Sequence, residues 1–338
     1  MKFYSITEHP IKIYGLAVTD VQARKFWRLP QKMLEIMPQY EFLGKRAVGG
    51  RVRFCTDSEN VTVKMTLAQA KEDINIPLSG SAGADIYLGR GKEASFLGYI
   101  APAFHVMEEV AVEKNFKKKR EMEVVTINLP RNDHLLSMEI GIDEKAEIKE
   151  APTYMIEAPI LFYGSSITEG GCAARVGNAY TSLVCRWLDA DYRNYGFSGS
   201  ARGEQEFAKY VTEHEKVSAF VYDYDHNAPD AEHLKATHEP FFRTIREKFP
   251  DLPILIMSRP DTDSDIEDST QRRDIIFQTY QNAVQGGDDK VWFLDGGTFF
   301  GKKSRSECTV DGTHPNELGF MRMAEAVYPV LREMLDCE

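Results

Sequence analysis

The chain has 338 residues, of which 43% are hydrophobic and 28% charged, and its formal net charge at pH 7 is −11. This length is typical of two domains of ordinary size, and the composition excludes a chain that is disordered throughout. The acidic balance argues against nucleic acid as a partner, because proteins bind a polyanion through clustered lysine and arginine.

The N-terminal residues from Met1 to Pro10 contain no apolar segment of a signal peptide, and the sequence has no run of about 18 apolar residues that could span a membrane. The five cysteines lack the CxxC spacing of a zinc site and are more typical of reduced thiols. We therefore expect a cytoplasmic protein with no membrane partner, no metal and no other cofactor. The sequence predicts no particular oligomeric state.

Residues 1–152 have the pattern of β structure. Segments 50–56 and 61–67 alternate apolar with polar residues around the turn-like Asp57–Asn60, which predicts a half-buried hairpin. The basic run from Lys114 to Arg120 lies among acidic residues and predicts a solvated loop. Further strands are expected at 83–88, 94–100, 121–129 and 136–142. Many short strands at this spacing are typical of a β-sandwich or jelly roll, so we predict an N-terminal β-sandwich domain.

From residue 153 to residue 338 the pattern changes to alternating β and α segments. Fully apolar strands are expected at 158–163, 218–222, 254–257 and 291–294. Helices are expected at 179–188, 240–249, 270–284 and 318–335. This alternation predicts a second, α/β domain, with a parallel sheet that helices cover on both faces.

Open sheets of this kind bind ligands at the carboxyl ends of their strands, so polar residues directly after apolar runs are candidate site residues. The first cluster runs from Tyr163 to Gly171 and contains two adjacent serines, Ser165 and Ser166. A serine on a strand-to-helix turn can present its hydroxyl above the sheet, close to backbone N–H groups that favour an oxyanion. By itself the cluster is more typical of a helix cap, and it is not the GxSxG turn of α/β-hydrolases, because Thr168 replaces the second glycine.

The most specific cluster is Asp311-Gly312-Thr313-His314-Pro315, which stands directly before the last predicted helix. An aspartate three residues before a histidine can orient the imidazole toward a serine, so the pair suits a catalytic triad. An Asx turn with a capping histidine is the simpler interpretation of this motif when it is taken alone.

Two further clusters, at 194–200 and 222–229, also follow strand-like runs. An oxyanion hole needs donors at about 3 Å from the developing charge, and a glycine N–H together with an asparagine amide can supply two of them. Either cluster alone is more typical of a turn. Four clusters at successive strand ends, in the order Ser, Gly, Asn and Asp-x-x-His, favour one common site.

In this order of motifs the chain resembles the SGNH/GDSL hydrolase family, whose four blocks contribute Ser, Gly, Asn and His. The resemblance implies a flavodoxin-like three-layer SGNH hydrolase domain in which Ser166 is the nucleophile and Asp311 and His314 complete the triad. It also implies an oxyanion hole made of the Ser166 N–H, the Gly199 N–H and the Asn227 side-chain amide.

The chain departs from that family in two places. Ser165 stands where the family has the Asp of its GDS motif, and the third block lacks the usual Gly-x-Asn-Asp form. Both departures indicate a divergent branch. Residues Gly83-Ala84-Asp85-Ile86-Tyr87 look like the GxDLY signature of a β-rich domain that precedes some bacterial SGNH domains.

Within that branch, the resemblance implies hydrolysis of small acyl esters, often acetyl groups on carbohydrate, so the expected partner is a small-molecule or oligosaccharide ester. The residues themselves indicate only acyl transfer to water. Aromatic residues at the strand ends would suit the walls of a sugar-binding cleft, although core packing is their commoner role. These residues are Tyr163, Tyr195, Phe197 and Tyr224.

Two alternatives remain open. The first is a metal-dependent hydrolase whose ligands come from one acidic, histidine-containing region, although no HExxH or CxxC motif accompanies it. Its candidate ligands are Asp223, Asp225, His226, Asp230, His233 and His238. The second is a catalytically inactive carbohydrate-binding protein, and the presence of all four catalytic positions weighs against it.

Overall fold

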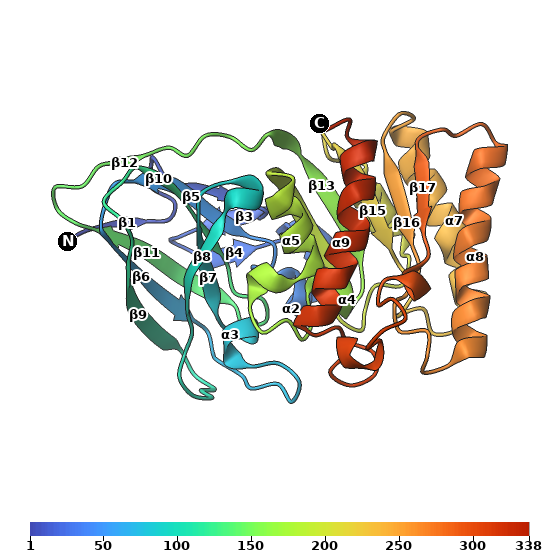
Figure 1. Ribbon diagram of the computed structural model, residues 1–338, viewed down its shortest axis with the longest axis horizontal. Coiled ribbons are helices and arrows are strands. Elements are labelled where there is room, and N and C mark those ends of the chain that lie inside the picture. Colours follow the sequence, from blue (N-terminus) through green and yellow to red (C-terminus); the bar gives the residue numbers. More distant parts are fainter. Residues whose placement is uncertain (338) are drawn as a thin grey trace.

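The computed structural model describes residues 1–337, in a β-rich N-terminal part and an α/β C-terminal part that lie side by side in Figure 1. The strands of the β-rich part are β1 (Lys2–Ser5), β2 (Lys12–Tyr14), β3 (Val18–Asp20), β4 (Lys25–Trp27), β5 (Arg51–Thr56), β6 (Asn60–Leu67), β7 (Ala84–Leu88), β8 (Ser95–Ile100), β9 (Val110–Lys117), β10 (Glu123–Asn128), β11 (Leu135–Ile142) and β12 (Ile148–Lys149). Its short helices are α1 (Gln31–Ile36), α2 (Glu41–Gly44) and α3 (Leu78–Ser81).

Two antiparallel sheets dominate the β-rich part. One has the strand order β1-β11-β6-β9, and the other has the order β12-β5-β10-β7-β8 with β2 beside β5. Alternate residues of both sheets, such as Phe54, Val63 and Ile127, fill one apolar core between them. The predicted β-sandwich is therefore confirmed.

The predicted hairpin of residues 50–67 is wrong, because β5 and β6 belong to different sheets. β5 pairs with β10, β12 and β2, whereas β6 pairs with β11 and β9. The chain crosses between the sheets at Ser58, whose buried hydroxyl donates to the Asn60 carbonyl oxygen at 2.6 Å. All of β5 is buried, since its polar face, with Arg51 and Arg53, packs against the α/β part instead of facing solvent.

The predicted solvated loop at Lys114–Arg120 is wrong for residues 114–117, which belong to β9, and for Lys118, which is buried with its Nζ 3.2 Å from Glu123. β9 runs to Lys117 and pairs with β6 along its whole length, as the edge strand of its sheet. Charged side chains are common on edge strands, because they discourage pairing with other chains. A basic run is therefore compatible with a strand as well as with a loop.

The α/β part has a parallel sheet of strands β13 (Ile156–Gly164), β14 (Ala190–Gly196), β15 (Ala219–Asp223), β16 (Ile254–Met257) and β17 (Val291–Leu294). Its helices are α4 (Ser166–Glu169), α5 (Tyr180–Trp187), α6 (Gln205–Val211), α7 (Ala231–Lys248), α8 (Ile266–Gln285) and α9 (Glu317–Met334). Side chains of α6, α7 and α8 pack on one face of the sheet, and those of α5 and α9 pack on the other. The predicted three-layer architecture is confirmed. Among the described residues, no helix has both the length and the apolar character that a membrane crossing requires.

The strand order of this sheet is β14-β13-β15-β16-β17, which is the flavodoxin-like order 2-1-3-4-5 in chain order. From β13 the chain first continues to β14, which lies on one side of β13. The later strands β15, β16 and β17 then follow one another on the other side. Ligands of open α/β sheets bind where the order reverses in this way, at the carboxyl ends of the strands. This crevice lies at the ends of β13 and β15, which carry the first and third motifs.

A cluster of three charged groups, Glu169, Arg28 and Arg46, is among the contacts that connect the two parts of the molecule. Glu169 of α4 is fully buried, and its Oε1 lies 3.0 Å from Arg28 Nη2 and 2.8 Å from Arg46 Nη1. Burial acts to raise the pKa of Glu169, but the guanidiniums of Arg46 and Arg28 outweigh it, so the net pKa is lowered. The carboxylate is therefore charged and pairs with two arginines of the β-rich part. It lies shortly after residues 164–167, called the nucleophile turn because of the role predicted for Ser166.

We expect Glu169→Ala to lower the free energy of unfolding by about 3–5 kcal/mol, because breaking a buried ion pair leaves an uncompensated charge. Urea unfolding monitored by circular dichroism measures this loss. The matched control is Glu213→Ala, since Glu213 pairs with Lys32 at 3.3 Å on an exposed surface. That variant should lose about 1 kcal/mol or less. Equal losses in the two variants would contradict the structural role of Glu169.

Candidate active site

The nucleophile turn separates the two adjacent serines. Ser165 is the N-cap of α4, and its Oγ accepts a hydrogen bond from the Ile167 N–H at 3.1 Å. Ser166 is the first residue of α4, and its Oγ lies 2.9 Å from His314 Nε2. The helix-cap interpretation therefore applies to Ser165, and only Ser166 presents its hydroxyl to an imidazole.

The Asp311 carboxylate has two separate tasks, one for each oxygen. Its Oδ2 lies 2.8 Å from His314 Nδ1, and its Oδ1 accepts the N–H groups of Thr313 at 3.0 Å and His314 at 2.8 Å. Burial acts to raise the pKa of Asp311, but the hydrogen bonds from His314 and Thr313 act in the opposite direction and outweigh it, so the net pKa is lowered. The turn and the triad contact are thus both present in one loop.

This loop contacts the β-rich part as well. Asn75 Nδ2 donates to Asp311 Oδ2 at 2.9 Å. Figure 1 shows the loop before α3 at the same end of the molecule as the loop before α9. Sequence reasoning missed Asn75, because it lies 236 residues from Asp311 and belongs to no motif.

Of the three predicted oxyanion donors, Ser166 lines the pocket beside His314, whereas Gly199 and Asn227 are not among its lining residues. Gly199 has a φ of +67°, and its pocket neighbour Ser198 donates its N–H to Glu169 Oε2 at 3.2 Å. Asn227 Nδ2 donates to the Phe197 carbonyl oxygen at 3.0 Å. A primary amide carries two N–H donors, so this contact orients Asn227 and leaves its second donor available.

Ser166 and His314 open onto a small pocket, about 150 Å³ in volume, between the two parts of the molecule. The α/β part contributes Ser166, Gly171, Cys172, Ser198 and His314, and the β-rich part contributes Arg46, Asp73, Asn75, Ile76, Arg131 and Asn132. The contribution of the β-rich part was not predicted. Its residues come from three separate loops, and nothing in their local sequence marks them as site residues.

The aromatic residues at the strand ends do not form the walls of this pocket. Tyr163, Tyr195, Phe197 and Tyr224 are at most 1% exposed and belong to the core under α6 and α7. Tyr163, for example, stacks on Phe241 with a centroid distance of 4.7 Å. Their place in the sequence reflects packing of the sheet against its helices, so they give no support for a sugar-binding wall.

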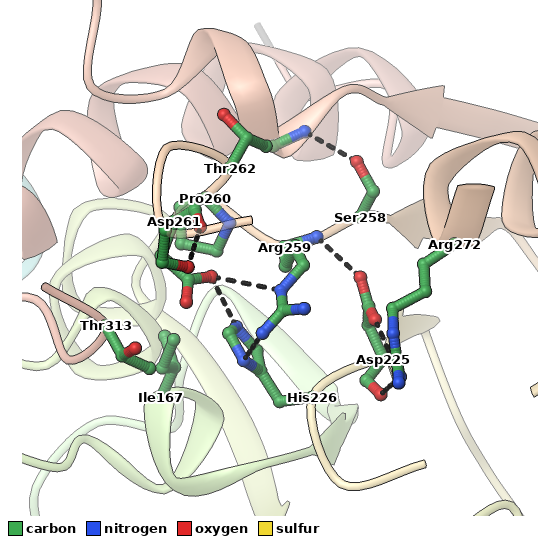
Figure 2. Close-up of polar contacts among 12 residues, drawn as sticks. Ile167, Asp225, His226, Ser258, Arg259, Pro260, Asp261, Thr262, Arg272 and Thr313 are labelled. Carbon is green, nitrogen blue, oxygen red and sulfur yellow. Dashed lines mark hydrogen bonds and ion pairs between the residues drawn. The ribbon is translucent and has the colours of Figure 1, made fainter. Parts of the chain in front are cut away.

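The candidate metal ligands of the third motif are dispersed over separate contacts (Figure 2). His226 lies between Asp261 and Arg259, with its Nε2 3.0 Å from Asp261 Oδ1 and its Nδ1 3.0 Å from Arg259 Nη2. Asp225 accepts the Arg259 backbone N–H at 3.1 Å and lies 3.7 Å from Arg272. These contacts tie the loops after β15 and β16 together, beside the labelled Ile167 and Thr313.

The remaining candidate ligands are also held elsewhere. Asp230 caps α7 through the His233 N–H, and the His233 ring contacts the Arg202 carbonyl oxygen at 2.9 Å. His238 is buried beside Thr279. Within residues 1–337, no three His, Cys, Asp or Glu side chains are grouped so that they could hold a metal ion.

Asp223 at the end of β15 is a buried carboxyl group with two hydroxyl donors. Its Oδ2 accepts hydrogen bonds from Thr168 Oγ1 at 2.7 Å and from the Tyr180 hydroxyl at 2.8 Å. Burial raises the pKa of Asp223 to about 6 despite these bonds. Its neutral form is therefore favoured in the folded protein relative to the unfolded chain.

This shift predicts a pH-dependent stability difference for Asp223→Asn. The pKa of about 6 in the folded protein lies above the ordinary value of 3.8. The stability that Asp223 contributes to the fold is therefore lost as the pH rises from about 4 through 6. Between pH 4 and pH 8 the free energy of unfolding of the variant, relative to that of the wild type, should rise by on the order of 3 kcal/mol. Urea unfolding of both proteins at the two pH values measures the gain. A stability difference that does not change with pH would contradict this account of Asp223.

Family models match both parts of the chain. The model of the GDSL-like lipase/acylhydrolase family matches residues 157–332, and the model of the N-terminus of SGNH-hydrolase-type esterases (GxDLY) matches residues 1–148. A search of curated proteins finds no match.

Solved structures resemble this chain over both of its parts. A GDSL-like lipase from Bacteroides ovatus superposes with a TM-score of 0.86 at 26% identity, over 99% of this chain and 98% of that one. A salicylyl-acyltransferase of a tetracycline biosynthetic pathway gives a TM-score of 0.77 at 16% identity, over 99% and 98%. An acetyl xylan esterase from the rumen bacterium Butyrivibrio proteoclasticus gives a TM-score of 0.63 at 13% identity, over 99% and 100%.

Proposed function

Because the chain belongs to the GDSL-like lipase/acylhydrolase family, and is thus a carboxylic ester hydrolase, we propose that it removes small acyl groups, acetyl above all, from carbohydrate. The reaction uses Ser166 as the nucleophile, His314 as the base and Asp311 as the residue that orients the base. The observation that carries this proposal is the continuous hydrogen-bonded series from Ser166 Oγ through the His314 ring to Asp311 Oδ2.

In the first half of the proposed reaction, Ser166 Oγ attacks the ester carbonyl carbon while its proton moves to His314 Nε2. The imidazolium that forms is stabilised by the Asp311 carboxylate at its other nitrogen. Collapse of the tetrahedral intermediate breaks the bond to the alcohol, which leaves with the proton from His314. In the second half, water attacks the carbonyl carbon of the acyl-enzyme and gives a proton to His314. Collapse of this second intermediate breaks the bond to Ser166 Oγ, which takes the proton back from His314, and the carboxylic acid leaves.

The oxyanion of the tetrahedral intermediate is proposed to accept hydrogen bonds from the Ser166 N–H, the Gly199 N–H and the Asn227 amide. Ser166 is the first residue of α4, so its N–H has no acceptor within that helix. The contact with the Phe197 carbonyl fixes one hydrogen of the Asn227 amide and holds its plane. These features support Ser166 and Asn227 as donors, and the assignment of Gly199 rests on the family resemblance.

We expect Asn227→Ala to lower kcat by about 10²–10³-fold, because one oxyanion donor typically contributes that much to the rate. The free energy of unfolding should fall by only about 1 kcal/mol, the value of one hydrogen bond. Steady-state kinetics on an acetyl ester, with a urea unfolding curve, measures both. Asn282→Ala is the control, because the amide of Asn282 on α8 donates to Glu239 on α7, outside the pocket. An unchanged kcat in Asn227→Ala would show that the third motif does not supply an oxyanion donor.

The size of the pocket supports a small acyl group. A pocket of about 150 Å³ beside Ser166 suits an acetyl group better than a long acyl chain. The acetyl xylan esterase among the similar structures supports a carbohydrate as the alcohol.

The substrate proposal is tested with monoacetylated sugars and with p-nitrophenyl esters of increasing acyl length. We expect the highest kcat/KM for acetyl esters, with a steady fall as the chain lengthens. A preference for long acyl chains would contradict the acetylesterase proposal and leave the triad untouched. Hydrolysis of p-nitrophenyl acetate without any hydrolysis of acetylated sugars would contradict only the proposal that the alcohol is a carbohydrate.

A further inference from the structure

A buried arginine without a partner faces the pocket of Ser166 and His314. Arg131 follows β10 in the β-rich part and is 3% exposed. Neither its Nε nor its Nη2 has a hydrogen-bond partner among the described residues, and its side chain lines the pocket. A side chain at Gly171 would come within 3.2 Å of Arg131 Nη1, so this glycine lets the guanidinium approach the nucleophile turn.

The charges around Arg131 are unbalanced. Glu169 is the carboxylate whose charge acts most strongly on Arg131, and it is already shared by Arg28 and Arg46. Arg46 also lines the pocket and has an unpartnered Nε, whereas Asp73 is the acidic side chain that faces the pocket. Two guanidiniums and one carboxylate therefore face the substrate space, which leaves an excess of positive charge there.

An unpaired buried cation is costly, because the protein interior solvates charge far less well than water does. Burial lowers the pKa of Arg131, which reflects the same cost. A ligand that supplies an anion recovers this free energy on binding. A guanidinium presents parallel N–H donors that match the two oxygens of a carboxylate, so a carboxylate is the anion that suits Arg131 best.

We propose that Arg131 binds a carboxylate of the substrate, so that the preferred substrates are acyl esters of acidic sugars. This inference rests on the proposed function, since it names the alcohol of the same reaction. The ester carbonyl lies at Ser166, and the acidic group of the sugar lies toward the β-rich part, against Arg131. The β-rich part thereby determines which alcohol the triad acts on.

The kinetic test compares two substrates acetylated at the same hydroxyl, a methyl glucuronoside and the matching neutral methyl glucoside. Wild-type protein should prefer the glucuronoside in kcat/KM by about 10- to 150-fold, the range expected for hydrogen bonds to a charged group. Arg131→Gln should remove this preference, mainly through a higher KM for the glucuronoside. Arg131→Lys should keep part of it, because it retains the charge but loses the paired donors.

The control variant is Arg243→Gln, in which an exposed arginine of α7 that pairs with Glu239 loses its charge. It should retain the wild-type preference. Two outcomes would overturn the inference. One is a wild-type protein that treats both substrates alike, and the other is an equal loss on both substrates in Arg131→Gln, which would assign Arg131 to the oxyanion instead.

A binding measurement keeps this inference separate from the proposed function. Calorimetry with free glucuronate, and with glucose for comparison, should show glucuronate binding in wild-type protein that is lost in Arg131→Gln. If glucuronate binds through Arg131 but no acetylated sugar is hydrolysed, the carboxylate site stands and the proposed esterase function fails. If acetylated sugars are hydrolysed but glucuronate binding does not depend on Arg131, the inference fails alone.

Discussion

Replacing Ser166 by alanine is expected to lower kcat by at least about 10⁴-fold, because only binding and oxyanion contacts then remain to accelerate the reaction. The Ser166 hydroxyl contacts the His314 ring and no apolar core, so the free energy of unfolding should change by less than about 1 kcal/mol. Hydrolysis of a small acetyl ester, with a urea unfolding curve for the same preparation, measures both effects.

The neighbouring serine provides a matched control for this prediction. Ser165→Ala removes the Oγ that caps α4, which should cost about 0.5–2 kcal/mol of stability. Its turnover should fall far less than that of Ser166→Ala. If Ser165→Ala abolished turnover while Ser166→Ala retained it, the assignment of the nucleophile would be wrong.

Replacing His314 by alanine should lower kcat about as much as the loss of Ser166, because the hydroxyl is a poor nucleophile without its base. The two residues act as one unit, so the double variant Ser166→Ala/His314→Ala should be no slower than either single variant. Rate measurements on all three proteins test this non-additivity. Losses that multiplied in the double variant would contradict a shared step.

Asp311→Asn is the graded variant in this series. An asparagine oxygen still accepts the N–H groups of Thr313 and His314, so the turn should remain. Its amide then faces His314 Nδ1 and favours the wrong tautomer of the ring, which should lower kcat by about 10²–10⁴-fold. A variant with wild-type turnover would show that Asp311 serves the turn alone.

The sheet of the α/β part could be predicted because its strands are continuous apolar runs. Strands 218–222, 254–257 and 291–294 each coincide with an observed strand to within one residue. Such strands are buried on both faces, so their composition marks them regardless of tertiary context. The order of the strands was implied only by the family resemblance, because an alternating series of β and α segments is compatible with more than one order of an open sheet.

The pairing in the β-rich part could not be predicted in the same way. Segments 50–56 and 61–67 each alternate as a strand should, and both are strands. The alternation of apolar and polar residues predicts which face of a strand is buried, but it does not predict which other strand pairs with it. The polar face of β5 proved to be covered by the α/β part, and no local pattern distinguishes such a covered face from one in solvent.

Site residues that belong to the sequence motifs could be predicted, whereas the residues around them could not. The spacing of Asp311 and His314 is local, so their contact was predictable. The choice of Ser166 over Ser165 came from the family resemblance, because spacing cannot separate adjacent serines, and the position of the imidazole beside Ser166 is consistent with that choice. Asn75 and Arg131 reach the pocket from loops of the other part of the molecule, and only the packing of the two parts brings them there.

Covalent labelling with a fluorophosphonate, followed by intact-mass measurement, tests whether Ser166 is an activated nucleophile. We expect one adduct on the wild-type protein, located at Ser166, and none on Ser166→Ala under the same conditions. A wild-type protein that stays unlabelled, or a Ser166→Ala variant that is labelled as readily as the wild type, would contradict this role of Ser166.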